Sequence, residues 1–388
     1  MSESLKVFFY TDTFLPAVDG VVTSMLNFKK ELESRGHEVY IFASGDSSTR
    51  KAVKKDHNII VVRGMKFKKY PQYNLAMLPI IAPIKEINIG RADIRHVQTP
   101  FTMGFYGLMA SRVNSTPLVS SFHTLFTNRE VINEYLTSSK RMQKILVDYA
   151  WAYARFFYNK SDVTIAPSRA IEQELNRRDI PNTAIVGNSV DLKRFNARVD
   201  GSRIRERLAK GDEKVVLYIG RISREKNIDT LIKAAKRLKK KKIKFVIGGT
   251  GPSIAHYQSL VSKLDVGSKV KFVGFVKDAE LPEYYAAADV FCIPSTFETQ
   301  GIVSLEAMAC GKPVVGADYL ALKELIKGGQ NGEKFAPKSS SDCARKIEKV
   351  INNISNYKKM EETAKSYSLK KTTDDLLKVY KEVIDKGK

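Results

Sequence analysis

The sequence predicts an α/β protein made of two units, each a parallel sheet wrapped by helices. Short apolar runs rich in Val, Ile and Phe alternate with amphipathic stretches, which is the pattern of strands joined by crossover helices. The pattern runs to about residue 190 and starts again after Phe195. A chain of 388 residues also exceeds the length of one ordinary core, so two domains are expected.

The first half is expected to contain strands separated by helices. Between the first two strands, the segment Val21–Arg35 has its apolar residues on one helical face and stops at Gly36. Strand, helix and strand at this spacing favour a parallel sheet. The expected strands are Lys6–Thr11, His37–Ala43, Ile59–Val62, Ile94–Thr99, Pro117–His123, Val163–Ser168 and Ala184–Ser189.

The second half repeats this pattern after a polar, basic stretch, Asn196–Lys214. Its first helix, Ile228–Lys242, ends in a run of lysines, and a final helix, Leu369–Lys386, has one apolar face that must pack on another part of the protein. In open α/β sheets ligands bind beyond the carboxyl ends of the strands, so functional residues are expected there. The expected strands are Val215–Gly220, Phe245–Gly249, Val270–Phe275, Val290–Ser295 and Pro313–Ala317.

Composition and charge limit the class of protein. The chain is 43% hydrophobic and 28% charged, and 65 Lys and Arg against 42 Asp and Glu give a formal net charge of +23. These proportions exclude a disordered chain and a polytopic membrane protein. The charge favours an anionic partner, which is nucleic acid, an anionic membrane surface or a phosphorylated substrate. Three cysteines without a CxxC spacing exclude a disulfide scaffold and disfavour a structural zinc site.

No segment is typical of export or of membrane insertion. The N-terminus lacks the basic and apolar regions of a signal peptide. The longest apolar stretch, Leu75–Ile84, is about ten residues long, whereas a spanning helix needs roughly twenty. We therefore expect a cytoplasmic protein whose contact with a membrane is peripheral.

The densest functional signal is the segment Ser295–Val315, where a strand ends, a loop carries Glu298, and Gly301 opens a helix that carries Glu306. A helix start after a glycine presents backbone N–H groups and the positive end of the helix dipole, which suits a phosphate. The two glutamates would accept hydrogen bonds from hydroxyl groups in a cleft between the two sheets. The alternative is that both glutamates are solvated and the glycine only forms a turn.

Two further segments follow strands of the second half. Gly220–Asn227 places Arg221 and Lys226 at the carboxyl end of a strand, where a diphosphate needs fixed positive charge. Gly248–Pro252, which contains Gly251, predicts another close backbone approach, although such glycine clusters are usually only turns. The chain contains no Asp-x-Asp, so arginine, lysine and helix dipoles, rather than a metal ion, would neutralise a leaving group.

The first half offers two candidates. The segment Tyr10–Val22 puts Gly20 ahead of a helix start, which makes it a second candidate phosphate contact. His123 is one of five histidines and ends an expected strand, so it is a candidate polar contact in the cleft. The alternative is a capping or core histidine.

Together, these segments resemble the family-4 retaining glycosyltransferases of the GT-B fold. FETQGIVSLEAMACGKPVV, with its Glu-x7-Glu spacing, is similar to the family signature, and GRISREKN is similar to its Gly-Arg-x4-Lys phosphate motif. DTFLPAVDGVV, SFHT, APS, NSVDLKRF and FVGFV occur in the family's order, so the resemblance covers the chain from Val7 to about Val383.

The resemblance implies domains, a reaction and residue roles. Residues 1–190 would form an acceptor-binding, Rossmann-like domain on which a crossover helix, 369–388, packs, and residues 191–368 would bind the nucleotide sugar. A hexose would move from a nucleoside diphosphate sugar with retention of configuration and without a metal ion or other cofactor. Glu298 would hold the sugar's hydroxyls, Glu306 those of the ribose, and His123 would meet the reacting sugar. The implied catalytic positions are His123, Glu298, Arg221 and Lys226, and the implied donor-binding positions are Gly20, Gly251, Phe275, Val276, Gly301, Ile302, Val303 and Glu306.

Two positions depart from the family pattern. Many relatives have His-x-His where this chain has His96-Val-Gln98, so the second histidine is missing. The crossover helix often starts with a Trp where this chain has Leu369, which affects packing rather than chemistry.

Similarity within the family favours a lipid acceptor. TFLPAVDGVVTS, TPFTMG and ETQG are similar to the branch that glucosylates diacylglycerol, and the excess positive charge suits an anionic leaflet. Met65–Tyr70 with Leu75–Ile84, and separately Trp151–Lys160, mix aromatic and basic residues as an interfacial anchor does. The alternative for Trp151–Lys160 is a core helix. A soluble acceptor stays open, and so does the choice between UDP-glucose and GDP-mannose as donor.

Two other functions stay open at this stage. The same fold serves a sugar-nucleotide epimerase, which would act without an acceptor. The pI of about 9.7 also suits a polyanion-binding protein with Lys239–Lys244 as its best patch. The positive charges are scattered over helices without RNP-type aromatic motifs or a zinc finger, so nucleic acid is not expected as a partner. The sequence makes no prediction of the oligomeric state.

Overall fold

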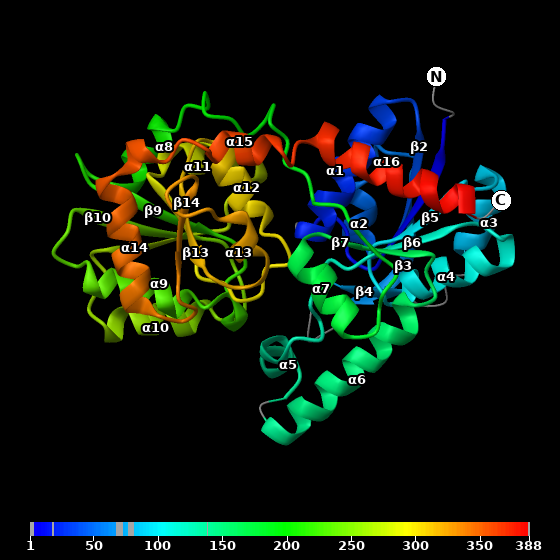
Figure 1. The fold of residues 1–388 in the computed structure, drawn as a ribbon, viewed down its shortest axis with the longest axis horizontal. Coiled ribbons are helices and arrows are strands. Elements are labelled where there is room, and N and C mark those ends of the chain that lie inside the picture. The colour runs from blue at the N-terminus through cyan, green and yellow to red at the C-terminus, as the bar shows by residue number, and fades with distance from the viewer. Residues whose placement is uncertain (1–3, 18, 67–72, 77–80, 138, 387–388) are drawn as a thin grey trace. The chain divides into compact units, whose positions relative to one another are not determined.

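The computed structural model describes residues 4–17, 19–66, 73–76, 81–137 and 139–386 (Figure 1). The chain divides into two compact units. Unit 1 consists of Met1–Ser189 and Leu369–Lys388, and unit 2 consists of Val190–Ser368. The division lies one residue before the boundary expected from the sequence.

The described residues of unit 1 form one sheet of eight strands: β1 (Lys6–Thr11), β2 (Glu38–Gly45), β3 (Ile59–Lys66), β4 (Asn74–Ala76), β5 (Ile94–Val97), β6 (Leu118–Ser121), β7 (Val163–Ala166) and β8 (Thr183–Ile185). Their order is β4-β3-β2-β1-β5-β6-β7-β8, and every neighbouring pair is parallel except β3 and β4. The chain changes the direction in which it adds strands between β1 and β5. Ligands bind at such a switch point in open α/β sheets.

The central strand β1 lies deep in unit 1, because Val7, Phe8, Phe9 and Tyr10 are all fully buried. A strand covered on both faces has a continuous apolar run rather than alternating polar and apolar residues, which is why the pattern predicted a parallel sheet. The helices described in unit 1 are α1 (Gly20–Ser34), α2 (Ser47–Ala52), α3 (Ile81–Ile89), α4 (Thr102–Asn114), α5 (Arg129–Tyr135), α6 (Lys140–Tyr158), α7 (Arg169–Arg177) and α16 (Leu369–Lys386).

The last helix of the chain, α16, packs on unit 1, as the resemblance implied. Leu376, Tyr380 and Val383 belong to the same buried apolar cluster as Val7 and Met25. The apolar face that the sequence left without a partner is therefore covered by α1 and the sheet of unit 1.

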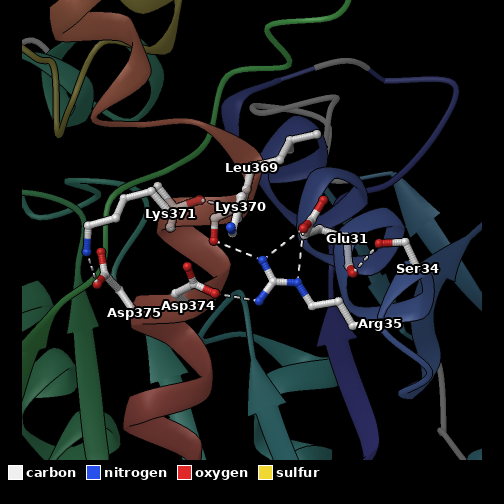
Figure 2. Close-up of polar contacts among 9 residues, drawn as sticks. Glu31, Ser34, Arg35, Leu369, Lys370, Lys371, Asp374 and Asp375 are labelled. Atoms are coloured by element: carbon white, nitrogen blue, oxygen red, sulfur yellow. Dashed lines mark hydrogen bonds and ion pairs between the residues drawn. The ribbon is translucent and has the colours of Figure 1, made fainter.

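Arg35, at the end of α1, adds a polar tie to α16 (Figure 2). Its Nη1 donates to Asp374 Oδ1 at 2.6 Å, and its Nη2 donates to the Lys370 carbonyl oxygen at 3.0 Å. Glu31 Oε1, one turn earlier on α1, accepts from Arg35 Nε at 3.0 Å and holds the guanidinium toward α16. One side chain thus joins the first helix of the chain to the last.

Unit 2 is built on one sheet of six strands: β9 (Lys214–Ile219), β10 (Ile243–Gly248), β11 (Val270–Gly274), β12 (Val290–Ile293), β13 (Val314–Ala317) and β14 (Gly332–Phe335). All neighbours are parallel, and their order is β11-β10-β9-β12-β13-β14. The switch point lies between β9 and β12. Two apolar clusters fill the faces of this sheet.

The connections of unit 2 are mostly helical: α8 (Ser202–Leu208), α9 (Ile228–Arg237), α10 (Ile254–Lys263), α11 (Leu281–Ala287), α12 (Ile302–Ala309), α13 (Leu320–Leu325), α14 (Ser340–Asn352) and α15 (Met360–Lys365). Short 3-10 turns add η1 (Arg224–Lys226), η2 (Asp278–Glu280) and η3 (Ile354–Asn356). The two ends of unit 2 are adjacent, because Val190 forms a parallel bridge with Ser368 and its N–H donates to the Tyr367 carbonyl oxygen at 2.9 Å.

Several elements differ from the sequence prediction. The helix expected over Ile228–Lys242 ends at Arg237, because the lysines after it turn into β10. The apolar stretch Leu75–Ile84 is not one element: it begins in β4, α3 starts at Ile81, and residues 77–80 lie outside the described residues. Most of Met65–Tyr70 also lies outside them. No helix in the described part of the chain is long and apolar enough to cross a membrane.

Candidate functional site

Charged residues follow both strands at the switch point of unit 2. Lys226 ends η1, the turn after β9, and Glu298 lies in the loop after β12. The Lys226 Nζ donates to Glu298 Oε1 at 2.7 Å. The structure therefore brings these two sequence-predicted residues together at the carboxyl ends of adjacent strands, where α/β sheets bind ligands.

Both members of this pair are largely buried: their side chains are 16% and 14% exposed for Lys226 and Glu298. The Lys226 Nζ also lies 5.4 Å from the centre of the Phe297 ring. Burial acts to raise the pKa of Glu298, but the charge and hydrogen bond of Lys226, with contributions from Ser295 and Arg221, hold this pKa below its ordinary value. Glu298 is thus an ionised acceptor in a fixed position, and the alternative that it is solvated is wrong.

Arg221 follows β9 directly and is oriented by a carboxylate that sequence reasoning did not single out. Its Nη2 donates to Glu225 Oε1 at 3.0 Å, and the Ser223 hydroxyl donates to the same oxygen at 2.6 Å. Glu225 is fully buried. The available signal was the position of this glutamate within the same motif, four residues after Arg221.

Close backbone contact between two loops explains the glycines of the GGTG segment. A Cβ at Gly249 would lie 1.9 Å from the Gly220 carbonyl oxygen, and a Cβ at Gly251 would lie 2.3 Å from that of Ile222. The Ile222 N–H donates to the Thr250 carbonyl oxygen at 2.8 Å. Gly251 therefore holds the loop after β10 against the Arg221 loop, and its contact with a donor stays a prediction.

The helix start predicted to bind phosphate is the N-terminus of α12. Gly301 caps it with a φ of 88°, a left-handed conformation that favours glycine. As a glycine, Gly301 has no side chain with which to cap this helix. The backbone N–H groups of Ile302 and Val303 therefore stand at a helix start that carries positive dipole charge.

Glu306 lies in the second turn of α12 and is only 8% exposed, so the alternative that it is solvated is also wrong. Its Oε2 accepts a hydrogen bond from the Tyr285 hydroxyl at 2.7 Å. Burial raises the pKa of Glu306 to about 7, although the Tyr285 hydrogen bond and the Arg194 charge act to lower it. Its carboxyl group therefore changes charge near neutral pH.

The residues expected to contact the base follow β11 but have different surroundings. The Phe275 side chain is 65% exposed, whereas Val276 is 7% exposed and belongs to the apolar core of unit 2. A base contact by Val276 would therefore use its backbone rather than its side chain. Both assignments stay predictions.

At the switch point of unit 1 the structure places a buried carboxylate, Asp12, directly after β1. Its oxygens accept from the Thr99 hydroxyl at 2.8 Å, the Thr102 hydroxyl at 2.5 Å and the Met103 N–H at 2.9 Å. Burial nevertheless raises the pKa of Asp12 to about 6. Sequence reasoning quoted this residue within a motif but gave it no role. A charged residue directly after a strand with an apolar centre, Val7–Tyr10, was the signal that could have identified it.

His123 lies two residues beyond β6, also at the carboxyl end of the sheet of unit 1. Its Nε2 lies 2.8 Å from Gln98 Oε1, which follows β5. Burial lowers the pKa of His123 to about 4, so the imidazole is neutral at physiological pH. Since the amide oxygen can only accept, Nε2 carries the proton in this contact.

Gly20 opens α1, as predicted, but the helix start already holds an anion. The Oδ1 of Asp19 accepts from the Val21 N–H at 3.0 Å and from the Val22 N–H at 2.9 Å. A phosphate at Gly20 would lie next to this carboxylate, which weakens the predicted phosphate contact.

Comparison with known proteins decides the family. The chain matches the family described as Glycosyltransferase Family 4 over residues 18–194 and the family described as Glycosyl transferases group 1 over residues 200–367. It is 30% identical over 339 residues to the alpha-monoglucosyldiacylglycerol synthase of Streptococcus pneumoniae, and the match covers 85% of this chain and 75% of that protein. The chain belongs to glycosyltransferase family 4.

A second relative of this glycosyltransferase is the sulfoquinovosyl transferase SQD2 of Arabidopsis thaliana. The two are 31% identical over 347 residues, which is 86% of this chain and 64% of that protein. The resemblance drawn from the motifs, including its similarity to the diacylglycerol glucosyltransferase branch, is thus confirmed. Nucleotide-sugar-dependent glycosyl transfer is confirmed as its function.

The fold of the glycosyltransferase is shared with a solved structure, that of Anabaena Alr3699/HepE in complex with UDP and glucose. The TM-score is 0.76 at 20% identity, with 97% of this chain and 100% of that chain covered. The expected GT-B fold with two Rossmann-like parallel-sheet domains is confirmed.

The position where this glycosyltransferase departs from the His-x-His pattern has a defined environment. His96 is buried, with Nδ1 2.7 Å from the Tyr380 hydroxyl of α16 and Nε2 2.7 Å from the Ser121 hydroxyl. The second position, Gln98, contacts His123 instead. The replacement of histidine by glutamine therefore places a neutral acceptor beside His123.

The predicted anchor Trp151–Lys160 is for the most part wrong, because α6 buries most of these aromatic side chains. Trp151, Phe157 and Tyr158 are at most 4% exposed, and Phe122 packs against Trp151 and Tyr158. The core-helix alternative is therefore correct for most of the second half of α6, which contains Trp151–Tyr158. Phe156 is the exception and is exposed.

Proposed function

We propose that this glycosyltransferase retains the configuration of the sugar, needs no metal ion or other cofactor, and transfers a hexose to a hydroxyl of a membrane lipid such as diacylglycerol. The observation that carries the proposal is the Lys226–Glu298 contact of 2.7 Å beside the open N-terminus of α12. Fixed positive charge, helix dipole and a hydroxyl-binding carboxylate lie together at one switch point, which suits a diphosphate joined to a sugar.

In this proposal the donor is held by unit 2. Lys226, Arg221 and the α12 start bind the diphosphate, Glu298 accepts from the sugar hydroxyls, and Glu306 accepts from the ribose. The buried carboxylate of Glu225 fixes the Arg221 guanidinium, so that the cation is preorganised rather than mobile. The contacts of Phe275, Val276 and Gly251 with the donor complete the proposed site.

The reaction breaks the bond between the anomeric carbon and the β-phosphate oxygen, which keeps the bonding electron pair. The negative charge that develops on this oxygen is stabilised by Lys226, Arg221 and the dipole of α12. The acceptor oxygen then bonds to the anomeric carbon on the same face and transfers its proton to the departing phosphate. A protein base is not needed in this sequence of steps.

His123 takes part as a neutral hydrogen-bonding group. Its low pKa means that it carries no charge when it meets the sugar, and Gln98 fixes which nitrogen carries the proton. A neutral imidazole can form a hydrogen bond without a charge, which suits a sugar hydroxyl.

A lipid acceptor is supported by the surface of α6 and by the names of two relatives. The first half of α6 exposes apolar side chains at helical spacing among exposed basic residues, which is the composition of an interfacial helix. The exposed apolar side chains are Met142, Ile145 and Tyr149, and the basic ones beside them are Lys140, Arg141 and Lys144. Alpha-monoglucosyldiacylglycerol synthases occur in both Streptococcus pneumoniae and Acholeplasma laidlawii. We therefore place the enzyme peripherally on the inner face of the cell membrane.

A panel of donors and acceptors tests the proposal. The enzyme is incubated with UDP-glucose or GDP-mannose, with and without diacylglycerol in phosphatidylglycerol vesicles, and the released nucleoside diphosphate is measured. We expect release that requires the lipid and is unchanged by EDTA, and an α-linked product from an α-linked donor by NMR. Loss of activity with EDTA, a β-linked product, transfer only to a soluble sugar, or isomerisation of the donor without an acceptor would contradict the corresponding part of the proposal.

A further inference from the structure

Unit 1 contains an apolar groove of about 590 Å³, a volume within the range of ligand sites. It lies between β4, α4 and α6. Its lining consists of Leu75, Ala76, Phe101, Thr102, Phe105, Tyr106, Met109 and Tyr153. None of these residues has a role in the donor site described above.

The groove begins at the switch point of unit 1. Thr102, which lines it, donates from its hydroxyl to Asp12 Oδ1 at 2.5 Å and accepts from the Ala76 N–H at 2.7 Å. One end of the groove therefore lies beside the buried carboxylate that follows β1. This is the edge of the sheet at which a ligand of unit 1 is expected.

The hydroxyl groups of the lining are already used within the protein. Thr102 donates to Asp12, Tyr106 donates to Glu86 Oε1 at 3.0 Å, and Tyr153 donates to the Pro100 carbonyl oxygen. The groove thus offers a ligand mainly carbon surface. A sugar in this position would lose hydrogen bonds to water that the lining does not replace, whereas a hydrocarbon would gain by leaving water.

The groove continues along the exposed side of α4. Phe105 is 45% exposed and Met109 is 50% exposed, whereas Val113, one turn later on α4, is exposed but does not line the groove. At the end of α4, the Arg112 Nη2 donates to the Lys160 carbonyl oxygen at 3.0 Å, which brings two basic residues to this end of the apolar face. Positive charge at the outer end suits an anionic bilayer surface.

We propose that this groove binds an acyl chain of the lipid acceptor, with the hydroxyl end of the lipid toward Asp12 and the tail along α4. The inference rests on the proposed lipid acceptor and adds the site that binds its acyl chain. It distinguishes an acceptor recognised by its headgroup alone from one recognised also by its hydrocarbon.

Chain-length dependence is the first test. Hexanoyl, octanoyl, decanoyl and dodecanoyl glycerol are used as acceptors below their critical micelle concentrations. We expect kcat/KM to rise by up to about fourfold per added methylene, the factor that corresponds to burying one methylene, until the groove is full. Equal kcat/KM for all four chains would overturn the proposal.

The variant Met109→Asp puts a charge in the groove on a half-exposed position, so the fold should be kept. We expect it to flatten the chain-length dependence while activity toward hexanoyl glycerol and the donor KM stay within about twofold. Val113→Asp, on the same face but outside the groove, is the matched control and should keep the dependence. If both variants behave alike, the effect comes from the surface of α4 and the groove assignment is wrong.

A binding test separates this inference from the proposed function. Dodecanoyl glycerol with a photoreactive diazirine at the chain end is cross-linked to the enzyme without donor, and the labelled peptides are identified by mass spectrometry. Labelling of α4 that is lost in Met109→Asp and kept in Val113→Asp supports the groove, even if transfer proceeds only to a soluble sugar. Labelling elsewhere overturns it, even if lipids are glycosylated. A dimer in sedimentation that Met109→Asp dissociates would overturn it too, since a second copy would then cover the groove.

Discussion

Each unit has a sheet whose strand order reverses at one switch point, and the two units differ in the charge that stands there. In unit 1 the strand order reverses between β1 and β5, and the residue after β1 is the buried carboxylate Asp12. In unit 2 the order reverses between β9 and β12, and the turn after β9 carries Arg221 and Lys226. Topology thus determines where a ligand binds, and the side chains that follow the strands determine which ligand charge the site favours.

The helix starts show the same contrast. In unit 1 the start of α1 binds the carboxylate of Asp19, and the start of α4 binds that of Asp12 through the Met103 N–H. In unit 2 the start of α12 has Gly301, which has no side chain with which to cap the helix. At these two starts unit 1 uses its own carboxylates, whereas the start of α12 is proposed to bind the phosphate of a ligand. This difference explains why the diphosphate is assigned to unit 2.

The largest expected effect is that of Lys226→Ala. Removal of this charge takes away stabilisation of the leaving phosphate and leaves the Glu298 carboxylate without its partner. We expect a loss of about 3 kcal/mol in transition-state stabilisation, which lowers kcat/KM by more than about a hundredfold. Initial rates with the preferred donor measure the effect, and thermal unfolding shows whether the fold is kept.

Lys233→Ala is the matched control for this experiment. Lys233 forms an exposed ion pair with Asp229 on α9, at 2.8 Å, and has no place in the proposed site. Its removal should change activity and stability by less than about 1 kcal/mol. Near-full activity in Lys226→Ala would mean that the positive charge of unit 2 does not meet the diphosphate.

A smaller effect is expected from pH. The pKa of Glu306 is raised to about 7, so the ionised fraction grows from about a tenth at pH 6 to about nine tenths at pH 8. Since the ionised form is the better acceptor for ribose hydroxyls, donor KM should fall by up to about tenfold over this range. His123, with a pKa of about 4, stays neutral throughout and adds nothing to the profile.

Two variants test whether Glu306 is the group that causes this pH dependence. Glu306→Gln cannot ionise, so its donor KM should stay high and flat. Tyr285→Phe removes a hydrogen bond that lowers the pKa of Glu306, so the midpoint should move above 7. An unchanged midpoint in Tyr285→Phe would show that another group titrates.

The smallest effect is expected from Asp19→Ala. It removes the cap of α1 and should cost about 1 kcal/mol in the free energy of unfolding, measured with urea. Asp46→Ala, which removes the equivalent cap of α2, is the control and should cost a similar amount. We expect donor KM within about twofold for both. A decrease of about fivefold or more in Asp19→Ala alone would mean that a phosphate does approach Gly20 and that unit 1 shares in diphosphate binding.

Much of the fold was predictable, because a strand buried on both faces must be apolar along its length. The runs around β1, β5 and β9 therefore marked strands, whereas the switch points became known only from the strand order. The short edge strand β14 was missed, because Gly332–Phe335 contains two charged residues and no apolar run. The early end of α9 was missed because lysines suit a helix and a solvated turn equally well.

The candidate site was predictable as a set of residues but not as a set of contacts. Lys226 and Glu298 were both found, yet their contact joins residues that follow two different strands, which requires the strand order. The roles of Glu225 and Gln98 were missed for a similar reason. Each acts by orienting a neighbour, and a sequence pattern identifies residue types rather than the partner that a side chain chooses.

The pairing of Val190 with Ser368 makes unit 2 an insertion whose entry and exit coincide. A segment bounded in this way can be exchanged between relatives without lengthening or shortening the remaining chain. Chimeras that exchange residues 190–368 would therefore transfer the preference for one sugar nucleotide as a module. The choice of acceptor would remain with the host protein.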